Sequence, residues 1–325
     1  MDQEIAQVEQ AYQNNLQRLQ QYVASLEDRI RRWRIQVFIR NYYLRYVRRW
    51  YDQQKQALDR TRTDEIAAIR QRYSKPDNRK KKACLVGINY VGSQYALNGC
   101  VNDVYKFREL LITKYGYNSA DIRILTNKAA TRANILAEFV RLLREAVAGD
   151  SLCFSFSGHG VYIRDRNGDE SDGQDELIVS ADFYGIIDDE FKAIINRYLK
   201  PGVQLFALFD NCHSGTILDL KYQHLKAGAP QLKVHNNTNE TAGQVVCISG
   251  CRDDQVSMDA YLEGKYNGAM TWALVETLSQ TNAADLTWEN GLTQLRNKLQ
   301  SRGFAQRPQL TSGQTLAIGQ TKITL

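Results

Sequence analysis

Glycine and proline are distributed unevenly along this chain of 325 residues. All 21 glycines lie at or after Gly87, and the first proline is Pro76. A stretch of 75 residues that lacks both helix breakers and is rich in Gln, Arg, Leu and Ala predicts continuous helix. The sequence therefore predicts an all-α segment over residues 1–75, followed by a domain of a different kind.

Apolar residues recur at spacings of three and four in the first half of this segment. They form one seam, which consists of Ile5, Val8, Tyr12, Leu16, Leu19, Val23, Leu26, Ile30, Trp33 and Val37. This periodicity is typical of a coiled coil. Because one helix cannot bury such a seam alone, we expect it to pair with a second copy, to fold back as a helical hairpin near residues 50–64, or to bind a partner.

The N-terminal segment is also basic. Residues 1–82 contain 19 Lys and Arg against 10 Asp and Glu, whereas the rest of the chain contains 23 against 26. Ile35-Gln36, with Arg40 and Arg45 after it, fits the IQ pattern of calmodulin-binding helices, except that Asn41 stands at the glycine position. Three functions stay open for this segment: binding to a calmodulin-like acidic protein, binding to RNA or an anionic membrane, and self-association.

A second sequence pattern follows the helical segment. Residues 76–82 are basic and include a proline, so they are interpreted as an exposed linker. Short apolar runs after it predict strands at 83–90, 121–126, 150–157, 176–181, 204–210 and 244–250. Amphipathic stretches between them predict helices at 101–115, 131–147, 187–199, 268–280 and 287–301. This alternation predicts an α/β domain over residues 83–325, with a mostly parallel sheet flanked by helices.

Two of the predicted strands are followed by short phrases that contain reactive side chains. These phrases are Ser157-Gly158-His159-Gly160 and Asp210-Asn211-Cys212-His213-Ser214-Gly215. Because the carboxyl ends of parallel strands meet at one edge of a sheet, we expect the His159 imidazole and the Cys212 thiol to lie close together. An imidazole that takes the proton of a thiol, and later protonates the leaving amine, is the apparatus of a cysteine peptidase. His213 is a rival base, but neighbouring residues at a strand end point in opposite directions, which favours His159.

Seven motifs follow one another between residues 83 and 320. They are Cys84 to Tyr90, Leu97 to Asp103, Ser157 to Gly160, Asp169 to Glu176, Ile187 to Glu190, Asp210 to Gly215 and Ile248 to Gln255. As a set, they resemble the metacaspases, the caspase relatives of plants, fungi, protists and bacteria. Animal caspases have Gln-Ala-Cys at the nucleophile, and Asp-Asn-Cys-His-Ser-Gly departs from that phrase. The resemblance implies the caspase-hemoglobinase fold, with a large-subunit region at 83–220, a short type I-like connection at 221–243 and a small-subunit region at 244–325.

The same resemblance implies cleavage after Arg or Lys. Metacaspases recognise these side chains in an acidic pocket, whose residues correspond to Asp103, Ser157 and Asp210. Buried carboxylates beside an active site are costly unless a cation joins them, and a basic substrate side chain supplies that cation. For Asp103, capping of the helix that follows it is an alternative role.

Calcium is the cofactor that the resemblance implies. Calcium-dependent metacaspases bind the ion through dispersed aspartates, which correspond to Asp172, Asp188, Asp189 and Asp219. These carboxylates, with water, supply the oxygen ligands that Ca²⁺ prefers; a solvated acidic surface is the alternative. The stretch 165–176 resembles an EF-hand loop, but Glu170 stands at its glycine position and the pattern predicts no helices around it.

Two features depart from the family pattern. The prodomains of type I metacaspases are usually rich in proline or contain a zinc finger, whereas residues 1–75 are proline-free. Gln255-Val-Ser-Met-Asp259 stands where Gln-Thr-Ser-Ala-Asp is usual. The six cysteines lack the spacing of a disulfide framework, and the sequence has neither a signal peptide nor an apolar run of 18 residues, so we expect a cytoplasmic protein.

These observations together predict a calcium-dependent, self-processing cysteine endopeptidase that cleaves protein substrates after Arg or Lys with a Cys–His dyad. Nucleic acid is not expected as its main partner. The main alternative is a coiled-coil or calmodulin-binding scaffold whose peptidase domain is vestigial, and an aspartate-specific caspase is a further alternative. The presence of both His159 and Cys212 favours an enzyme over a scaffold.

Overall fold

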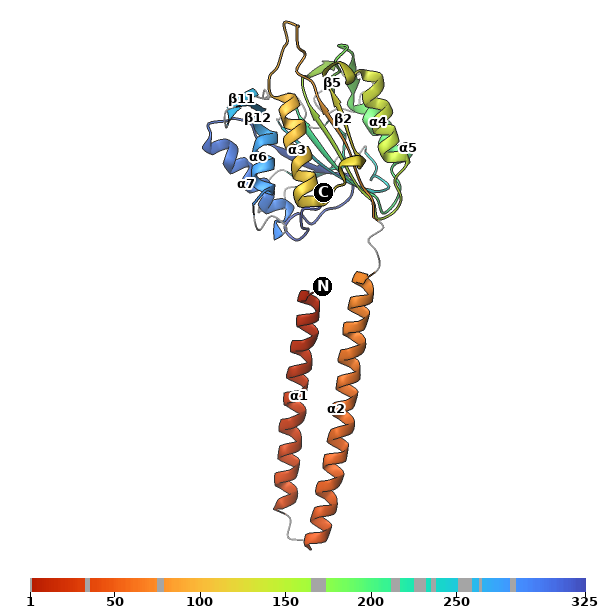
Figure 1. Cartoon of the computed structure of the whole chain (residues 1–325), viewed down its shortest axis with the longest axis vertical. Coiled ribbons are helices and arrows are strands. Elements are labelled where there is room, and N and C mark those ends of the chain that lie inside the picture. Colours follow the sequence, from red (N-terminus) through yellow and green to blue (C-terminus); the bar gives the residue numbers. More distant parts are fainter. Residues whose placement is uncertain are drawn as a thin grey trace. The chain divides into compact units, whose positions relative to one another are not determined.

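The computed structural model describes residues 2–32, 36–74, 79–164, 174–211, 217–224, 232–234, 238–250, 259–262, 265–280 and 285–325. The chain divides into two compact units, Met1–Asn78 and Arg79–Leu325 (Figure 1). Ile35, Asp172, Cys212 and His213 lie outside the described residues.

The first unit is a hairpin of two helices, α1 (Asp2–Arg31) and α2 (Val37–Ser74) (Figure 1). Residues early in α1 contact residues late in α2, so the helices are antiparallel. The contacts between them include Tyr12 with Asp59, Tyr22 with Trp50, and Glu27 with Arg48. α2 packs along the apolar seam of α1, where Ile30 is buried and the seam residues from Ile5 to Leu26 are half-buried, whereas Val37 is exposed.

The turn of the hairpin is not where the sequence predicted it. α1 ends at Arg31 and α2 continues through residues 50–64 without a break, so the expectation of a turn in that stretch is wrong. The stretch is polar, but a two-helix hairpin covers only one stripe of each helix, so polar residues stay helical on the exposed sides. The IQ-like pattern also does not form one helix within the described residues, since Gln36 precedes α2.

The second unit is built on an eight-stranded sheet. Its parallel part is β2 (Ile122–Thr126), β1 (Lys81–Gly87), β3 (Ser151–Ser157), β7 (Gln204–Asp210) and β10 (Gln244–Ser249), in that spatial order. Three antiparallel strands extend it beyond β10: β13 (Gln309–Ser312), β8 (Tyr222–His224) and β9 (Leu232–Val234). The predicted, mostly parallel sheet is confirmed. Lys81 and Lys82, which were assigned to the linker, belong to β1.

Two predictions about strands need correction. The apolar run at 176–181 does not join the main sheet: β5 (Gln174–Val179) pairs with β4 (Gly160–Arg164) and β6 (Gly185–Ile187) in a separate antiparallel sheet. The connection 221–243, for which no strand was predicted, contributes β8 and β9 to the main sheet. A short apolar run predicts a strand but not its partners, and three-residue edge strands leave almost no periodic signal. A further hairpin consists of β11 (Asp259–Leu262) and β12 (Lys265–Gly268).

Helices cover both faces of the main sheet (Figure 1). One face packs against α3 (Cys100–Tyr115), α6 (Ala269–Leu278) and α7 (Trp288–Ser301), and the other against α4 (Arg132–Arg144) and α5 (Asp188–Tyr198). Two 3-10 turns, η1 (Ser119–Asp121) and η2 (Asn127–Ala129), flank β2. Alternate side chains of β7 point to opposite faces, so Phe206 packs with the first set of helices and Phe209 with the second. Within the described ranges, no helix has both the length and the apolar character needed to cross a membrane.

Candidate active site

The predicted nucleophile and base follow neighbouring parallel strands at equivalent positions. β3 and β7 pair in register with Ser157 opposite Asp210. His159 comes two residues after Ser157, and Cys212 two residues after Asp210. Although Cys212 lies outside the described residues, this register directs both chain segments to the same edge of the sheet.

The cysteines within the described residues are unsuitable as nucleophiles. Cys84, Cys100, Cys153 and Cys247 are free thiols buried in the core. Burial raises the pKa of Cys84 to about 12 and also raises the pKa of Cys153, so their thiolates are disfavoured. Of the other two cysteines, Cys251 follows β10, which is separated from β3 by β7. Of Cys212 and Cys251, Cys212 is the one that follows a strand next to β3, the strand that precedes His159.

Backbone and ring contacts orient the His159 imidazole. Its Nε2 atom lies 2.7 Å from the backbone oxygen of Tyr95. A carbonyl oxygen only accepts hydrogen bonds, so in the neutral imidazole Nε2 has the hydrogen and Nδ1 has the free lone pair. The ring also packs against the ring of Tyr90, with 4.7 Å between the centroids. His159 is thus arranged to accept a proton at Nδ1.

The Tyr90 hydroxyl forms hydrogen bonds with two backbone groups, one of His159 itself and one of β5. Its hydroxyl accepts a hydrogen bond from the His159 amide at 3.0 Å and donates one to the Val179 carbonyl at 2.6 Å. Burial raises the pKa of Tyr90 above its ordinary value, so the phenol keeps the proton that it donates. A Cβ atom at Gly158 would lie 2.8 Å from the Tyr90 hydroxyl oxygen, which explains the glycine beside His159. Neither Tyr90 nor Tyr95 was predicted to contact the base.

Three residues that were predicted to form the acidic pocket meet at this edge. Asp103 comes from the first turn of α3, Ser157 from the end of β3 and Asp210 from the end of β7, and all three are buried. The Ser157 hydroxyl donates to Asp103 Oδ2 at 2.7 Å. The N-cap of α3 is Gly99, which makes no side-chain capping bond. The carboxylate of Asp103 therefore serves this cluster and does not cap its helix.

The start of α6 completes the cluster. The Gly268 amide donates to Asp103 Oδ1 at 2.9 Å, and the Thr271 amide donates to Asp210 Oδ2 at 2.8 Å. A Cβ atom at Gly268 would overlap with Oδ2 of Asp210 and lie 2.7 Å from Oδ2 of Asp103, so both carboxylates face this glycine. The positive end of the helix dipole stabilises the two negative charges. Gly268 and Thr271 belong to no sequence motif of their own, so they were not predicted as part of the site.

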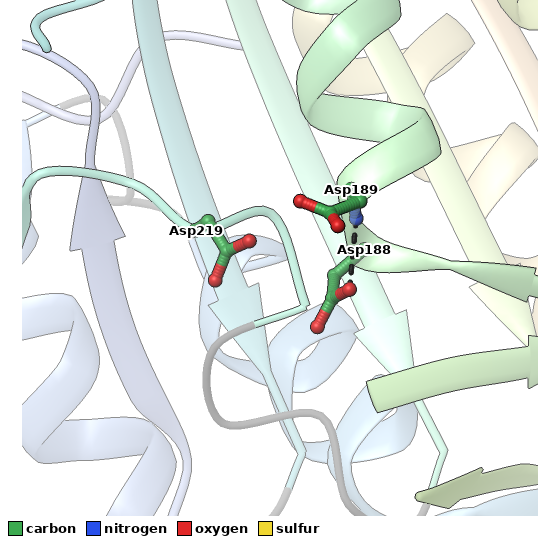
Figure 2. Close-up of side chains that lie close together, drawn as sticks. All are labelled: Asp188, Asp189 and Asp219. Carbon is green, nitrogen blue, oxygen red and sulfur yellow. Dashed lines mark hydrogen bonds between the residues drawn. The ribbon is translucent and has the colours of Figure 1, made fainter. Parts of the chain in front are cut away.

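A second group of carboxylates lies at the start of α5 (Figure 2). Ligand atoms of Asp188, Asp189 and Asp219 all lie within 4.8 Å of one another. Asp188 is buried and accepts hydrogen bonds from the amides of Glu176 and Asp189, each at 2.8 Å. Three of the four predicted calcium ligands are thus close together, while Asp172 lies outside the described residues.

Lys192 approaches this second group from the next turn of α5. Its Nζ atom lies 3.5 Å from Oδ2 of Asp219, whose side chain is 8% exposed. Asp219 adopts a positive φ of 44°, which is unusual for a residue other than glycine. Three carboxylates supply the hard oxygen donors that Ca²⁺ prefers, so these residues fit a calcium ion if Lys192 moves aside.

Comparisons with known proteins agree with this fold. The family model of the metacaspase peptidase C14 domain matches residues 81–221. Metacaspase-1 of Meyerozyma guilliermondii is 36% identical over 72% of this chain and 69% of its own length. Metacaspase-1B of Aspergillus niger is 34% identical over 74% of this chain and 66% of its own length. A crystal structure of a Geobacter sulfurreducens protein, 24% identical, has a TM-score of 0.56 and covers 75% of this chain and 97% of that protein.

The mostly parallel sheet, the helices on both of its faces and the matching C14 domain define a caspase-like cysteine peptidase. Within that class, the chain belongs to the metacaspase family.

Proposed function

We propose that this protein is a calcium-dependent endopeptidase that hydrolyses peptide bonds after Arg or Lys, with Cys212 as the nucleophile and His159 as the base. The observation that supports it most is the pair of buried carboxylates, Asp103 and Asp210, that face Gly268 at the edge where His159 lies. A pocket of this charge next to an active site favours a positively charged substrate side chain.

The specificity follows from the cost of burying two negative charges. Hydroxyl and amide donors hold Asp103 and Asp210 in place, but each donor contributes only a partial charge. A guanidinium or ammonium group between the carboxylates compensates both charges. An aspartate side chain at the same place would add a third negative charge, which argues against the specificity of animal caspases.

The chemistry uses the lone pair on Nδ1 of His159. That atom takes the proton of the Cys212 thiol, and the sulfur adds to the scissile carbonyl carbon. The imidazolium then gives the proton to the leaving amine as the C–N bond breaks, which leaves a thioester on Cys212. Water attacks the thioester, with His159 again as the base, and regenerates the free thiol. Backbone amides near Gly160 and Cys212 are the proposed donors to the oxyanion.

The proposed calcium ligands are Asp188, Asp189 and Asp219, with Asp172 as a fourth. Ca²⁺ held by these residues would offset most of their negative charge; the residues come from the start of α5 and from the chain that follows β7, where the nucleophile lies. The proposed role of the ion is to order this part of the site, and the ion takes no part in bond breaking.

Self-cleavage in the connection 221–243 is part of the proposal. Lys233 is exposed on the edge strand β9, and it has the kind of side chain that the acidic pocket would accept.

Fluorogenic peptides that differ only in the residue before the cut bond test the proposal. We expect release from the Arg and Lys peptides in the presence of calcium, and no turnover of the Asp peptide. Cys212→Ala and His159→Ala should each lower the rate by several orders of magnitude, whereas Cys251→Ala, the matched control, should leave it unchanged. Calcium-independent turnover, or turnover by the Cys212 variant, would refute the proposal.

A further inference from the structure

The first unit has an uneven distribution of charge along its length. Between Asp28 and Asp52 the sequence contains eight arginines and no acidic residue. This stretch includes the end of α1 and the beginning of α2, so it forms the closed end of the hairpin (Figure 1). Residues 2–28, by contrast, contain five acidic residues and a single arginine. The positive charge of the hairpin is therefore concentrated at its closed end.

Acidic residues of α1 compensate part of this charge. Glu27 lies 3.2 Å from both Arg31 and Arg48, and Asp28 lies 2.5 Å from Arg32. These exposed pairs lie at the border of the basic stretch, and six of the eight positive charges remain after both acidic residues are counted. The closed end thus stays strongly positive.

Arginines and tyrosines alternate on one exposed side of α2. We call Tyr42, Arg45, Tyr46 and Arg49 the tyrosine–arginine stripe; their spacing of three and four places them on one face of the helix. Tyr42 is 56% exposed and Tyr46 is 59% exposed, and both arginines are exposed, whereas Val47 is buried in the hairpin. Farther along α2, residues 52–66 contain no aromatic residue. Among the side chains of α2 that the structure describes, the exposed aromatic rings thus lie in its most basic part.

We propose that the tyrosine–arginine stripe binds the surface of a membrane that contains anionic phospholipids. A guanidinium group forms paired hydrogen bonds with phosphate oxygens, and tyrosine rings prefer the level of the lipid headgroups. Charge complementarity identifies the partner as anionic. Exposed rings beside arginines on one helix face suit the level of the headgroups, whereas single-stranded nucleic acid is usually bound in a groove that follows its backbone.

This contact would be peripheral and reversible. The hairpin has no apolar span among its described residues, so attraction between arginines and headgroups has to supply most of the binding. Such attraction weakens as salt is added, because ions screen exposed charges within about 10 Å at 0.1 M. Anionic lipids are concentrated in the leaflet that faces the cytoplasm, which agrees with the compartment expected from the sequence.

Co-sedimentation with lipid vesicles tests this inference on the full chain, as the Cys212→Ala variant so that no self-cleavage occurs. We expect binding to phosphatidylcholine vesicles that contain about one third phosphatidylserine, and none to pure phosphatidylcholine. Arg45→Gln with Arg49→Gln should weaken binding about 30-fold, since each arginine near such a surface contributes roughly fivefold. Tyr42→Ser with Tyr46→Ser should also weaken it.

Lys55→Gln with Arg60→Gln is the matched control, because it removes the same charge from exposed positions of the same helix outside the stripe. This control should bind nearly as well as the parent, and circular dichroism should show equal helicity for all variants. Three results would overturn the proposal: equal binding to neutral and anionic vesicles, equal losses of binding in the stripe and control variants, or no binding to vesicles. Binding of poly-uridine RNA or calcium-loaded calmodulin through the stripe, without vesicle binding, overturns it in favour of that partner.

Discussion

The peptidase unit contains two groups of aspartates that differ in what holds them. Asp103 and Asp210 accept hydrogen bonds from parts of the fold that cannot easily move, namely the Ser157 hydroxyl and the amides of Gly268 and Thr271. In the second group, backbone amides likewise hold Asp188, but Asp219 contacts the side chain of Lys192, which rotates about several bonds.

This difference is the basis on which the two acidic groups are proposed to select different cations. Fixed donors hold the carboxylates of Asp103 and Asp210 against Gly268, so two negative charges lie at one place. A lysine counter-ion leaves its carboxylate when a small divalent ion offers a stronger interaction with several oxygens at once. We therefore propose that the first group determines substrate specificity and the second calcium dependence, and the following predictions test that division.

The largest effect is expected in the pocket. Asp210→Asn keeps the size of the side chain and an acceptor for the Thr271 amide, but it removes the charge that a basic substrate needs. We expect kcat/KM for an Arg peptide to fall about 1,000-fold, because removal of one partner of a buried charge pair costs several kcal/mol. The calcium concentration for half-maximal activity should stay unchanged. Asp285→Asn, at an exposed position, is the control, and a loss below tenfold in Asp210→Asn would remove that residue from the pocket.

A smaller effect, of a different kind, is expected at the calcium group. Asp189→Asn with Asp219→Asn removes two of the three clustered carboxylates and should raise the calcium concentration for half-maximal activity at least about tenfold. At saturating calcium the preference for Arg over other residues should be the same as in the parent. Titration with buffered calcium, with a fluorogenic Arg peptide as the readout, measures both quantities. If this double variant changed the preference for Arg and left the calcium response unchanged, the calcium group would determine specificity, and the proposed division of roles would be wrong.

A change beside the base should alter the rate of peptide cleavage. It should change neither the preference for Arg and Lys nor the response to calcium. Tyr90→Phe keeps the ring against His159 but removes the hydroxyl that binds the His159 amide and the Val179 carbonyl. Because the imidazole would be less well positioned, we expect kcat to fall about tenfold with little change in KM or in the calcium response. Tyr184→Phe, at an exposed position, is the control. An unchanged kcat in Tyr90→Phe would show that the hydroxyl does not position the base.

The smallest effect is expected at Lys192. Lys192→Gln removes a cation that competes with calcium for Asp219, so half-maximal activity should require about two- to fivefold less calcium. Isothermal titration of calcium into the Cys212→Ala background gives the same quantity without turnover. Weaker calcium binding in this variant would mean that Lys192 supports the site and does not compete for it.

Much of this organisation could be predicted from the sequence, because the signals are local. Buried apolar runs such as 204–210 predict parallel strands, and a histidine two residues after such a run predicts a functional edge. The contacts that complete the pocket could not be predicted. Gly268 binds Asp103 across 165 positions of chain, and no single-sequence pattern reports a backbone amide as a partner. The turn of the hairpin was also missed, because no glycine or proline marks it.

The most direct test of the central claim is a mass-spectrometric map of every bond that the protein cuts in an unbiased peptide mixture, with calcium and with a calcium chelator. With calcium, we predict cuts after Arg and Lys at comparable frequency, and cuts after other residues near background. With the chelator, we predict no cuts. Cys212→Ala should make no cuts under either condition. Cuts after Asp, cuts without preference, or the same cuts in the chelator would contradict the claim.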